Sequence, residues 1–279
     1  MKSAERCRFM KKRRIDSFIL ALTALIILIP VLNIVIWAFT ARWAWPALLP
    51  QRFSARGLEE ILHRGKETGQ LLLSSVSISL ITAILSVLVG TMSARALVFY
   101  EFRGKGLVQF LCMLPFFVPA TVFVMGVQIL FIRLHLAGTA AGVILVHLIC
   151  SLPYAVRLIS DGMQASGLRL EEQARVLGAS PFSAFWHAGI PAIRPVLFSA
   201  LGMSYIVSFS QYFLTLIVGG GKVRTFTIVM VPYLQNGSRD IACIYSLIFT
   251  GISLLIFMLF SQAAKRLGAQ TEGGLYADE

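Results

Sequence analysis

The sequence predicts an all-α membrane protein with six transmembrane helices. Of the 279 residues, 57% are hydrophobic and only 14% are charged, whereas soluble domains carry about 25% charged residues. The apolar residues gather into six runs, and each run supplies the roughly 20 residues that a helix needs to cross a bilayer. The runs cover approximately residues 17–39, 71–97, 108–132, 138–159, 193–218 and 241–264. Lipid is therefore the expected solvent for most of the chain.

The first run follows a strongly basic head, residues 1–16, which contains seven Lys or Arg. A secretory signal has an apolar core of only about 7–15 residues, and this run is longer, so we expect an uncleaved first span. The predicted organisation is a basic head, a six-helix transmembrane domain over residues 17–266 and a polar tail over residues 267–279.

An even number of spans places both termini on one side of the membrane. Assigning the head to the cytoplasm puts 16 of the 25 Lys and Arg on that side, as the positive-inside rule requires. This bias accounts for the net charge of +12. The chain lacks a basic soluble face interleaved with aromatic residues, so we expect no nucleic-acid partner.

The insert between the fourth and fifth runs, residues 170–191, is polar and capable of forming helices. Residues 170–177 contain neither Gly nor Pro, and Glu171 and Glu172 fall in the first turn, where the helix dipole favours anions. Gly178 can adopt the left-handed conformation that ends a helix. The orientation above places this insert in the cytoplasm.

A second short helix is predicted to follow within the insert. Ser180 and Pro181 suit the N-cap and first helical positions. Phe182, Phe185 and Trp186 then stand at i, i+3 and i+4, so we expect three large apolar side chains on one face. A connecting loop needs no such face, and we interpret it as a docking element for a partner protein.

The sequence carries no recognisable catalytic motif. A P-loop requires Ser or Thr after its Gly-Lys pair and a second Gly five residues before the pair, and the pairs at Gly65, Gly104 and Gly221 meet neither condition. The histidines lie in separate segments without metal-ligand spacing. They are His63, His135, His147 and His187. We therefore expect that the chain is not itself an enzyme and that it binds no metal.

A proton-coupled carrier usually places carboxylates inside its spans. Asp16 and Asp240 lie only at the edges of predicted spans, and no carboxylate stands at mid-span. His147 is the one ionisable side chain near mid-span. We interpret it as a neutral, hydrogen-bonded interior residue, since a proton relay needs a chain of such groups. A carrier driven by sodium remains an alternative.

Two runs contain periodic polar side chains. In the fifth, Ser204, Ser208, Gln211 and Thr215 step by four, three and four, with Tyr212 beside them, and are predicted to share one helical face. Packing between helices and the lining of a translocation path both remain open for this face, since Gln and Tyr are large for close packing.

In the second run the polar side chains are all small. For these we favour helix packing, because small residues are the usual interhelical surface in membranes. They are Ser75, Ser79, Thr82 and Ser86. Pro115 and Pro119 in the third run predict an ordinary kink.

The insert resembles the Glu-Ala-Ala loop, E-A-A-x-x-x-G-x9-I-x-L-P, of permease subunits from binding-protein-dependent ABC importers. The positions that match are Glu172, Ala174, Gly178 and Pro191. Ile190 replaces the family's Leu conservatively, whereas Gln173 and Ala188 depart from the pattern. Residues 219–242 are more loosely similar to members that handle iron, thiamine or polyamines.

The resemblance implies a type I ABC importer permease architecture in a bacterial inner membrane, with the insert acting as a coupling loop. It implies three protein partners: a cytoplasmic ABC ATPase dimer, a second permease subunit that is identical or homologous, and an extracytoplasmic solute-binding protein. The cargo would be a small molecule. This chain would bind no cofactor, and ATP and Mg would sit on the ATPase.

Together, the helix pattern and the resemblance assign docking of the ATPase to eight residues. These are Glu172, Ala174, Gly178, Ala179, Pro181, Phe182, Phe185 and Trp186. The alternatives to an importer permease are a stand-alone, ion-coupled secondary transporter and a membrane assembly protein. The sequence does not indicate which substrate is moved.

Overall fold

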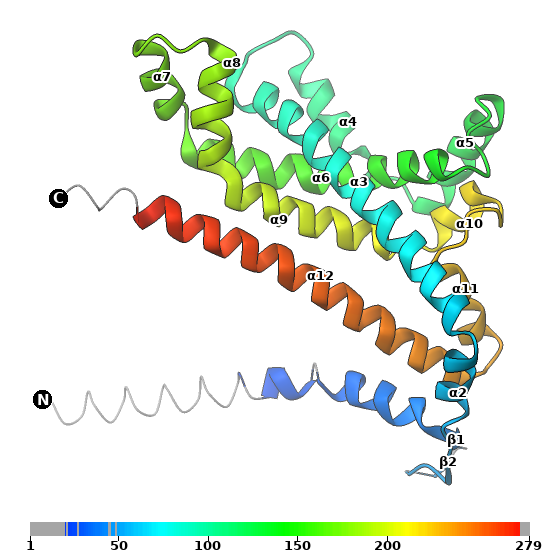
Figure 1. Ribbon diagram of the computed structural model, residues 1–279. Coiled ribbons are helices and arrows are strands. Elements are labelled where there is room, and N and C mark those ends of the chain that lie inside the picture. Colours follow the sequence, from blue (N-terminus) through cyan, green and yellow to red (C-terminus); the bar gives the residue numbers. More distant parts are fainter. Residues whose placement is uncertain (1–19, 21, 27, 44–45, 48, 274–279) are drawn as a thin grey trace, which may run out of the picture. The chain divides into compact units, whose positions relative to one another are not determined.

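The computed structural model describes residue 20 and residues 22–273, except residues 27, 44, 45 and 48 (Figure 1). The predicted basic head therefore lies outside the described residues. The chain forms two compact units, residues 1–65 with 232–249, and residues 66–231 with 250–279. Each unit is described by itself.

The larger unit is built from helices. Those wholly or mostly within it are α3 (Gly65–Phe99), α4 (Lys105–Phe117), α5 (Ala120–Arg133), α6 (Ala140–Ser166), α7 (Arg169–Val176), α8 (Pro181–Ala184), the π-helix η1 (Phe185–Gly189), α9 (Ile190–Phe209), α10 (Phe213–Gly219), α11 (Phe226–Gln235) and α12 (Arg239–Gly273). α12 continues past residue 267, so it enters the segment predicted as a polar tail.

The smaller unit combines helices with a short strand pair. It contains the helix Leu22–Ala38, the antiparallel strands β1 (Thr40–Arg42) and β2 (Arg52–Phe53), α2 (Arg56–His63), and residues 232–249 from the end of α11 and the start of α12. Gly57 of α2 lies against α12, because a Cβ added there would be 3.0 Å from Cδ1 of Ile244.

Four helices among the described residues are long and apolar enough to cross a membrane. They are Gly65–Phe99, Ala140–Ser166, Pro181–Phe209 and Arg239–Leu267. α4 and α5 together meet the same test but are bent by 112°, and Leu22–Ala38 is shorter than a full span. The structure thus supports an all-α membrane protein with four or five candidate spans in the described part of the chain.

The third apolar run is interrupted rather than kinked. α4 ends at Phe117, Val118 has an extended backbone (φ −90°, ψ 125°), and α5 begins after Pro119. A residue that precedes proline is sterically biased away from the helical region, so the helix stops and restarts in a new direction. The expectation of an ordinary kink at Pro115 and Pro119 is therefore wrong.

The core of the larger unit contains two clusters of buried apolar side chains, one between α3, α6 and α9 and the other between α3, α5, α6 and α10. α6 and α9 run side by side (Figure 1). A Cβ added at Gly162 of α6 would lie 2.8 Å from both methyl groups of Val196 in α9, so the two backbones approach closely at this point. The small polar residues predicted to pack, Ser75, Ser79, Thr82 and Ser86, are all buried in α3. Ser86 shares a hydrogen bond of 2.6 Å with Ser151 of α6, in agreement with the packing interpretation.

Candidate functional site

The insert begins with α7, as its sequence predicts. Glu171 and Glu172 occupy the first turn, and the helix ends near Leu177. Gly178 adopts φ +94°, a conformation that is costly for residues with a Cβ. Its N–H donates to the carbonyl of Arg175 at 3.0 Å. The predicted helix and its glycine terminus are confirmed.

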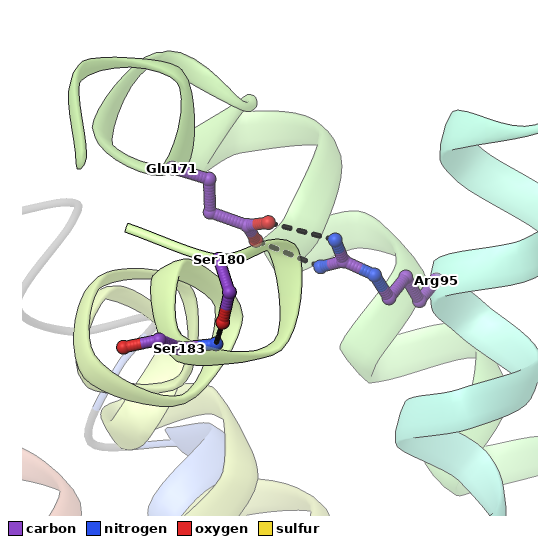
Figure 2. Close-up of polar contacts among 4 residues, drawn as sticks. All are labelled: Arg95, Glu171, Ser180 and Ser183. Atoms are coloured by element: carbon purple, nitrogen blue, oxygen red, sulfur yellow. Dashed lines mark hydrogen bonds and ion pairs between the residues drawn. The ribbon is translucent and has the colours of Figure 1, made fainter. Parts of the chain in front are cut away.

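The second helix starts where predicted but does not remain separate. The Ser180 hydroxyl accepts a hydrogen bond of 3.2 Å from the N–H of Ser183 (Figure 2), and Pro181 occupies the first helical position. The Ser-Pro start is thus confirmed. α8 continues through the π-helical turn Phe185–Gly189 into α9, so the insert leads into a span without a break.

The aromatic side chains divide between two faces of this helix. Phe182 and Trp186 are 75% and 57% exposed, and their rings stack with centroids 6.3 Å apart. Phe185 is only partly exposed. At 3.6 residues per turn, position i+4 lies about 40° to one side of position i and i+3 about 60° to the other. The prediction that all three share one exposed face is therefore wrong for Phe185.

Phe185 faces an ion pair that the sequence did not predict. Nη1 and Nη2 of Arg95 each donate a hydrogen bond of 2.7 Å to a different carboxylate oxygen of Glu171 (Figure 2). The Arg95 guanidinium also lies over the Phe185 ring, with Cζ 4.2 Å from the centroid. We call these three residues the insert anchor. A two-pronged Arg–carboxylate contact fixes orientation as well as distance.

The surroundings of the anchor are fitted to the Glu171 carboxylate. Glu171 is 7% exposed, and a Cβ added at Gly189 would overlap its carboxylate oxygen Oε1. The anchor borders a small cavity that also touches Phe99 of α3 and Met163 of α6. The anchor therefore ties α7 and η1 to the end of α3.

The insert also exposes apolar side chains. Val176 and Leu177 are each 88% exposed, and we call these two residues, together with Phe182 and Trp186, the docking face. Single exposed apolar residues are ordinary on a protein surface, but a group on one short element marks an interaction site. Neither Val176 nor Leu177 is among the docking residues that the sequence predicts.

The other predicted docking residues lie on or beside this element. Glu172, Gly178 and Pro181 are exposed, whereas Ala174 and Ala179 are partly buried. The N–H of Ala179 donates to the carbonyl of Ala174 at 3.0 Å, which joins the end of α7 to the following turn. The insert thus brings the predicted residues together, except that Phe185 belongs to the anchor.

The predicted translocation-path residues do not share one helix. α9 ends at Phe209 and α10 begins at Phe213, so Ser204 and Ser208 precede the break, Gln211 and Tyr212 lie within it, and Thr215 follows it. The prediction of a continuous helical face is wrong for this reason.

His147 of α6 connects the two sides of the break. Its Nδ1 lies 2.9 Å from the hydroxyl of Ser208, and its Nε2 lies 2.9 Å from that of Thr215. The Gln211 carbonyl accepts hydrogen bonds from the hydroxyls of Thr215 and Thr227. The interpretation of His147 as a buried, hydrogen-bonded interior residue is confirmed. Within the described residues, the buried Ser204 hydroxyl has no hydrogen-bond partner.

Comparison with known proteins decides the family. Residues 86–270 match the model of the binding-protein-dependent transport system inner membrane component. The chain belongs to this family. The permease is therefore a multi-pass inner-membrane transport protein of the ABC type, and the anchor, the docking face and the α9–α10 break all lie within the matched residues.

Several curated relatives are transport system permeases. The permease is 24% identical, over 80% of its length and 84% of the relative, to the putative 2-aminoethylphosphonate transport system permease protein PhnV of Salmonella typhimurium. It is 31% identical, over 64% of its length and 71% of the relative, to the molybdate/tungstate transport system permease protein WtpB of Pyrococcus abyssi.

The fold is shared with a solved transporter. A bacterial ABC transporter involved in the import of the acidic polysaccharide alginate contains a chain that matches with a TM-score of 0.62 at 15% identity, covering 93% of the permease and 99% of that chain. The same kind of transporter in complex with an alginate pentasaccharide-bound periplasmic protein matches with a TM-score of 0.64 at 14% identity, covering 92% and 96%. At these identities the likeness concerns the fold alone.

Proposed function

We propose that this permease is the transmembrane subunit of an ABC importer, and that residues 169–189 couple it to a separate cytoplasmic ATPase. The observation that carries the proposal is that the insert is both exposed and anchored. It exposes Val176, Leu177, Phe182 and Trp186, and it is fixed to α3 through Arg95 and Glu171. An element that only linked two spans would need neither feature.

The docking face suits a helix-in-groove interaction with the ATPase. Movement of the groove on the ATPase would be transmitted to the membrane spans of the permease by two routes. One is the continuous helix from Pro181 to Phe209, and the other is the Arg95–Glu171 pair at the end of α3. A displacement of the insert that both routes transmit would tilt α9 and α3 together and switch access to the path.

The finer organisation belongs to the same proposal. It includes six spans, cytoplasmic termini, a second permease subunit that completes the path, and an extracytoplasmic solute-binding protein that delivers a small solute. A solved relative of the fold is in complex with a substrate-bound periplasmic protein, which supports the last partner. ATP and Mg would be held by the ATPase, and this chain would bind no cofactor.

For the path itself, we propose the residues around the α9–α10 break. Gln211 and Tyr212 are partly exposed at a point where the helix is interrupted. Interrupted helices at membrane depth are tolerated where they line a cavity or are buried in protein, and these two polar side chains favour the former. Ser204, Ser208 and Thr215 would support them from the two adjoining helices.

The test removes the apolar character of the docking face. Trp186→Glu and Phe182→Glu should each reduce ATPase recovery with the solubilised permease by about thirtyfold, the effect of losing an interface residue worth ~2 kcal/mol. Leu62→Glu is the matched control, because Leu62 of α2 is 69% exposed and lies outside the insert.

Three results would count against this function. One is undiminished ATPase recovery and uptake in both docking-face variants. A second is transport by the purified permease alone in liposomes under a proton or sodium gradient, which would identify a secondary carrier instead. Retained partner binding without any flux in the complete complex would instead indicate an assembly protein.

A further inference from the structure

The smaller unit contains a polar pocket that is remote in sequence from the insert. Its volume is about 420 Å³, within the ~300–1,000 Å³ of ligand sites. The side chains that matter for its chemistry are Trp37, Arg42, Trp43, Arg56, Arg239 and Asp240. We call it the arginine pocket.

The charges in the arginine pocket do not balance. Arg56 pairs with Asp240, with Nε 3.3 Å from Oδ2, and this pair is internally neutral. Arg42 and Arg239 form no ion pair within the described part of the chain. The Arg239 guanidinium instead lies over the Trp37 ring, with Cζ 4.9 Å from the centroid. Two guanidinium groups are therefore left to attract an anion.

The start of α12 adds to this positive field. Gly237 and Ser238 line the arginine pocket directly before the helix begins at Arg239, and α12 is 35 residues long. The first-turn N–H groups of a helix lack intrahelical acceptors and carry the positive end of its dipole. The start of α12 and the arginine side chains thus favour the same sign of ligand.

The surroundings of the arginine pocket indicate what kind of anion it takes. The apolar helix Leu22–Ala38 contributes Trp37 to the pocket near its end. Val35, Ile36 and Phe39, which flank Trp37 in the sequence, are exposed apolar side chains. Trp37 and Trp43 stack there with centroids 5.1 Å apart. Tryptophan at the end of an apolar helix is typical of the headgroup level of a bilayer. A soluble carboxylate would neutralise the guanidinium groups but would leave the exposed apolar side chains next to Trp37 uncovered.

From these observations we infer that the arginine pocket binds the phosphodiester of an anionic phospholipid. The phosphate oxygens would accept from the forked guanidinium groups of Arg42 and Arg239, a geometry that arginine provides and lysine does not. The acyl chains would cover the exposed apolar side chains next to Trp37. This inference does not depend on the importer function or on the coupling loop.

The experiment titrates the purified full-length permease with phosphatidylglycerol and counts retained lipid by native mass spectrometry. Arg42→Gln with Arg239→Gln should weaken retention by at least tenfold, since both charge-assisted contacts to the phosphate are lost. Arg52→Gln is the matched control, because Arg52 is an exposed residue of β2 that does not line the pocket. Circular dichroism and Tm report whether each variant is folded.

A second pair of variants keeps the test decisive if the double Gln protein is unstable. Arg42→Lys with Arg239→Lys retains both charges but loses the forked geometry, and should weaken retention less than the Gln pair. Millimolar inorganic phosphate should not displace the lipid. Equal retention of lipid by the wild type and the Gln pair would overturn the inference. Full displacement of the lipid by inorganic phosphate would also overturn it, because the pocket would then be a site for free anions.

Discussion

Replacing Glu171 by Gln tests whether the insert anchor holds the coupling loop in place. The substitution keeps the size of the side chain but removes the charge that faces Arg95. The side chains of Arg95 and Glu171 are 20% and 9% exposed, so the pair is partly screened. We therefore expect Glu171→Gln to reduce the free energy that holds the insert closed by about 2–3 kcal/mol, less than the 3–5 kcal/mol lost when a fully buried pair is broken.

This loss should appear as local opening of the insert. A free-energy change of about 2–3 kcal/mol corresponds to a roughly 30- to 160-fold change in an opening equilibrium. Hydrogen exchange of peptides from residues 169–189, in the permease without its ATPase, should accelerate by that factor. Exchange in α5, which does not touch the anchor, should stay unchanged.

Glu172→Gln is the matched control, because Glu172 is the next residue in the chain and is exposed. It should leave the exchange of the insert unaffected, whatever its effect on the ATPase. The double variant Arg95→Gln with Glu171→Gln should lose less stabilising free energy than the two single variants lose in sum, since the two side chains interact directly. Wild-type exchange rates in Glu171→Gln would refute the idea that this ion pair fixes the insert.

Three further predictions concern single positions. Gly189→Ala should displace the Glu171 carboxylate, because the added Cβ overlaps Oε1, and the insert should exchange hydrogen faster, as in Glu171→Gln. Gly178→Val should destabilise the α7–α8 turn by about 1–2 kcal/mol, since φ +94° is unfavourable for a β-branched residue, and proteolysis at the turn should accelerate. His147→Leu should lower the Tm of the detergent-solubilised permease, since the buried Ser208 hydroxyl would lose its partner at a cost of about 1–3 kcal/mol, whereas Thr215 would keep its bond to the Gln211 carbonyl.

Each of these predictions has a matched control. Gly251→Ala adds a Cβ where nothing lies within 4 Å and should leave exchange in the insert unchanged. Gly178→Asn should be milder than the Val variant, because Asn tolerates left-handed conformations. His147→Gln retains a donor and an acceptor and should preserve more of the Tm. If a control variant had a larger effect than the variant it is matched to, the corresponding explanation would be wrong.

The sequence alone determined the features that depend on neighbouring residues. The apolar runs are set by composition along a stretch of chain, and the helix that ends at Gly178 is set by glycine's access to positive φ. The cap at Ser180 requires only that a hydroxyl stand three residues before an N–H group. The spacing of Glu172 and Gly178 within the insert was also sufficient to suggest the family.

Only the tertiary structure decided which side chains meet across the fold. Arg95 and Glu171 are 76 positions apart, and no local pattern links an arginine at the end of one span to one of two adjacent glutamates. The same holds for His147, which joins Ser208 to Thr215 across a break that the hydrophobic pattern does not reveal. Apolar periodicity reports which residues avoid water, but the partner of a buried polar group depends on which helices pack together. That choice placed Phe185 against Arg95 and left Phe182 and Trp186 exposed.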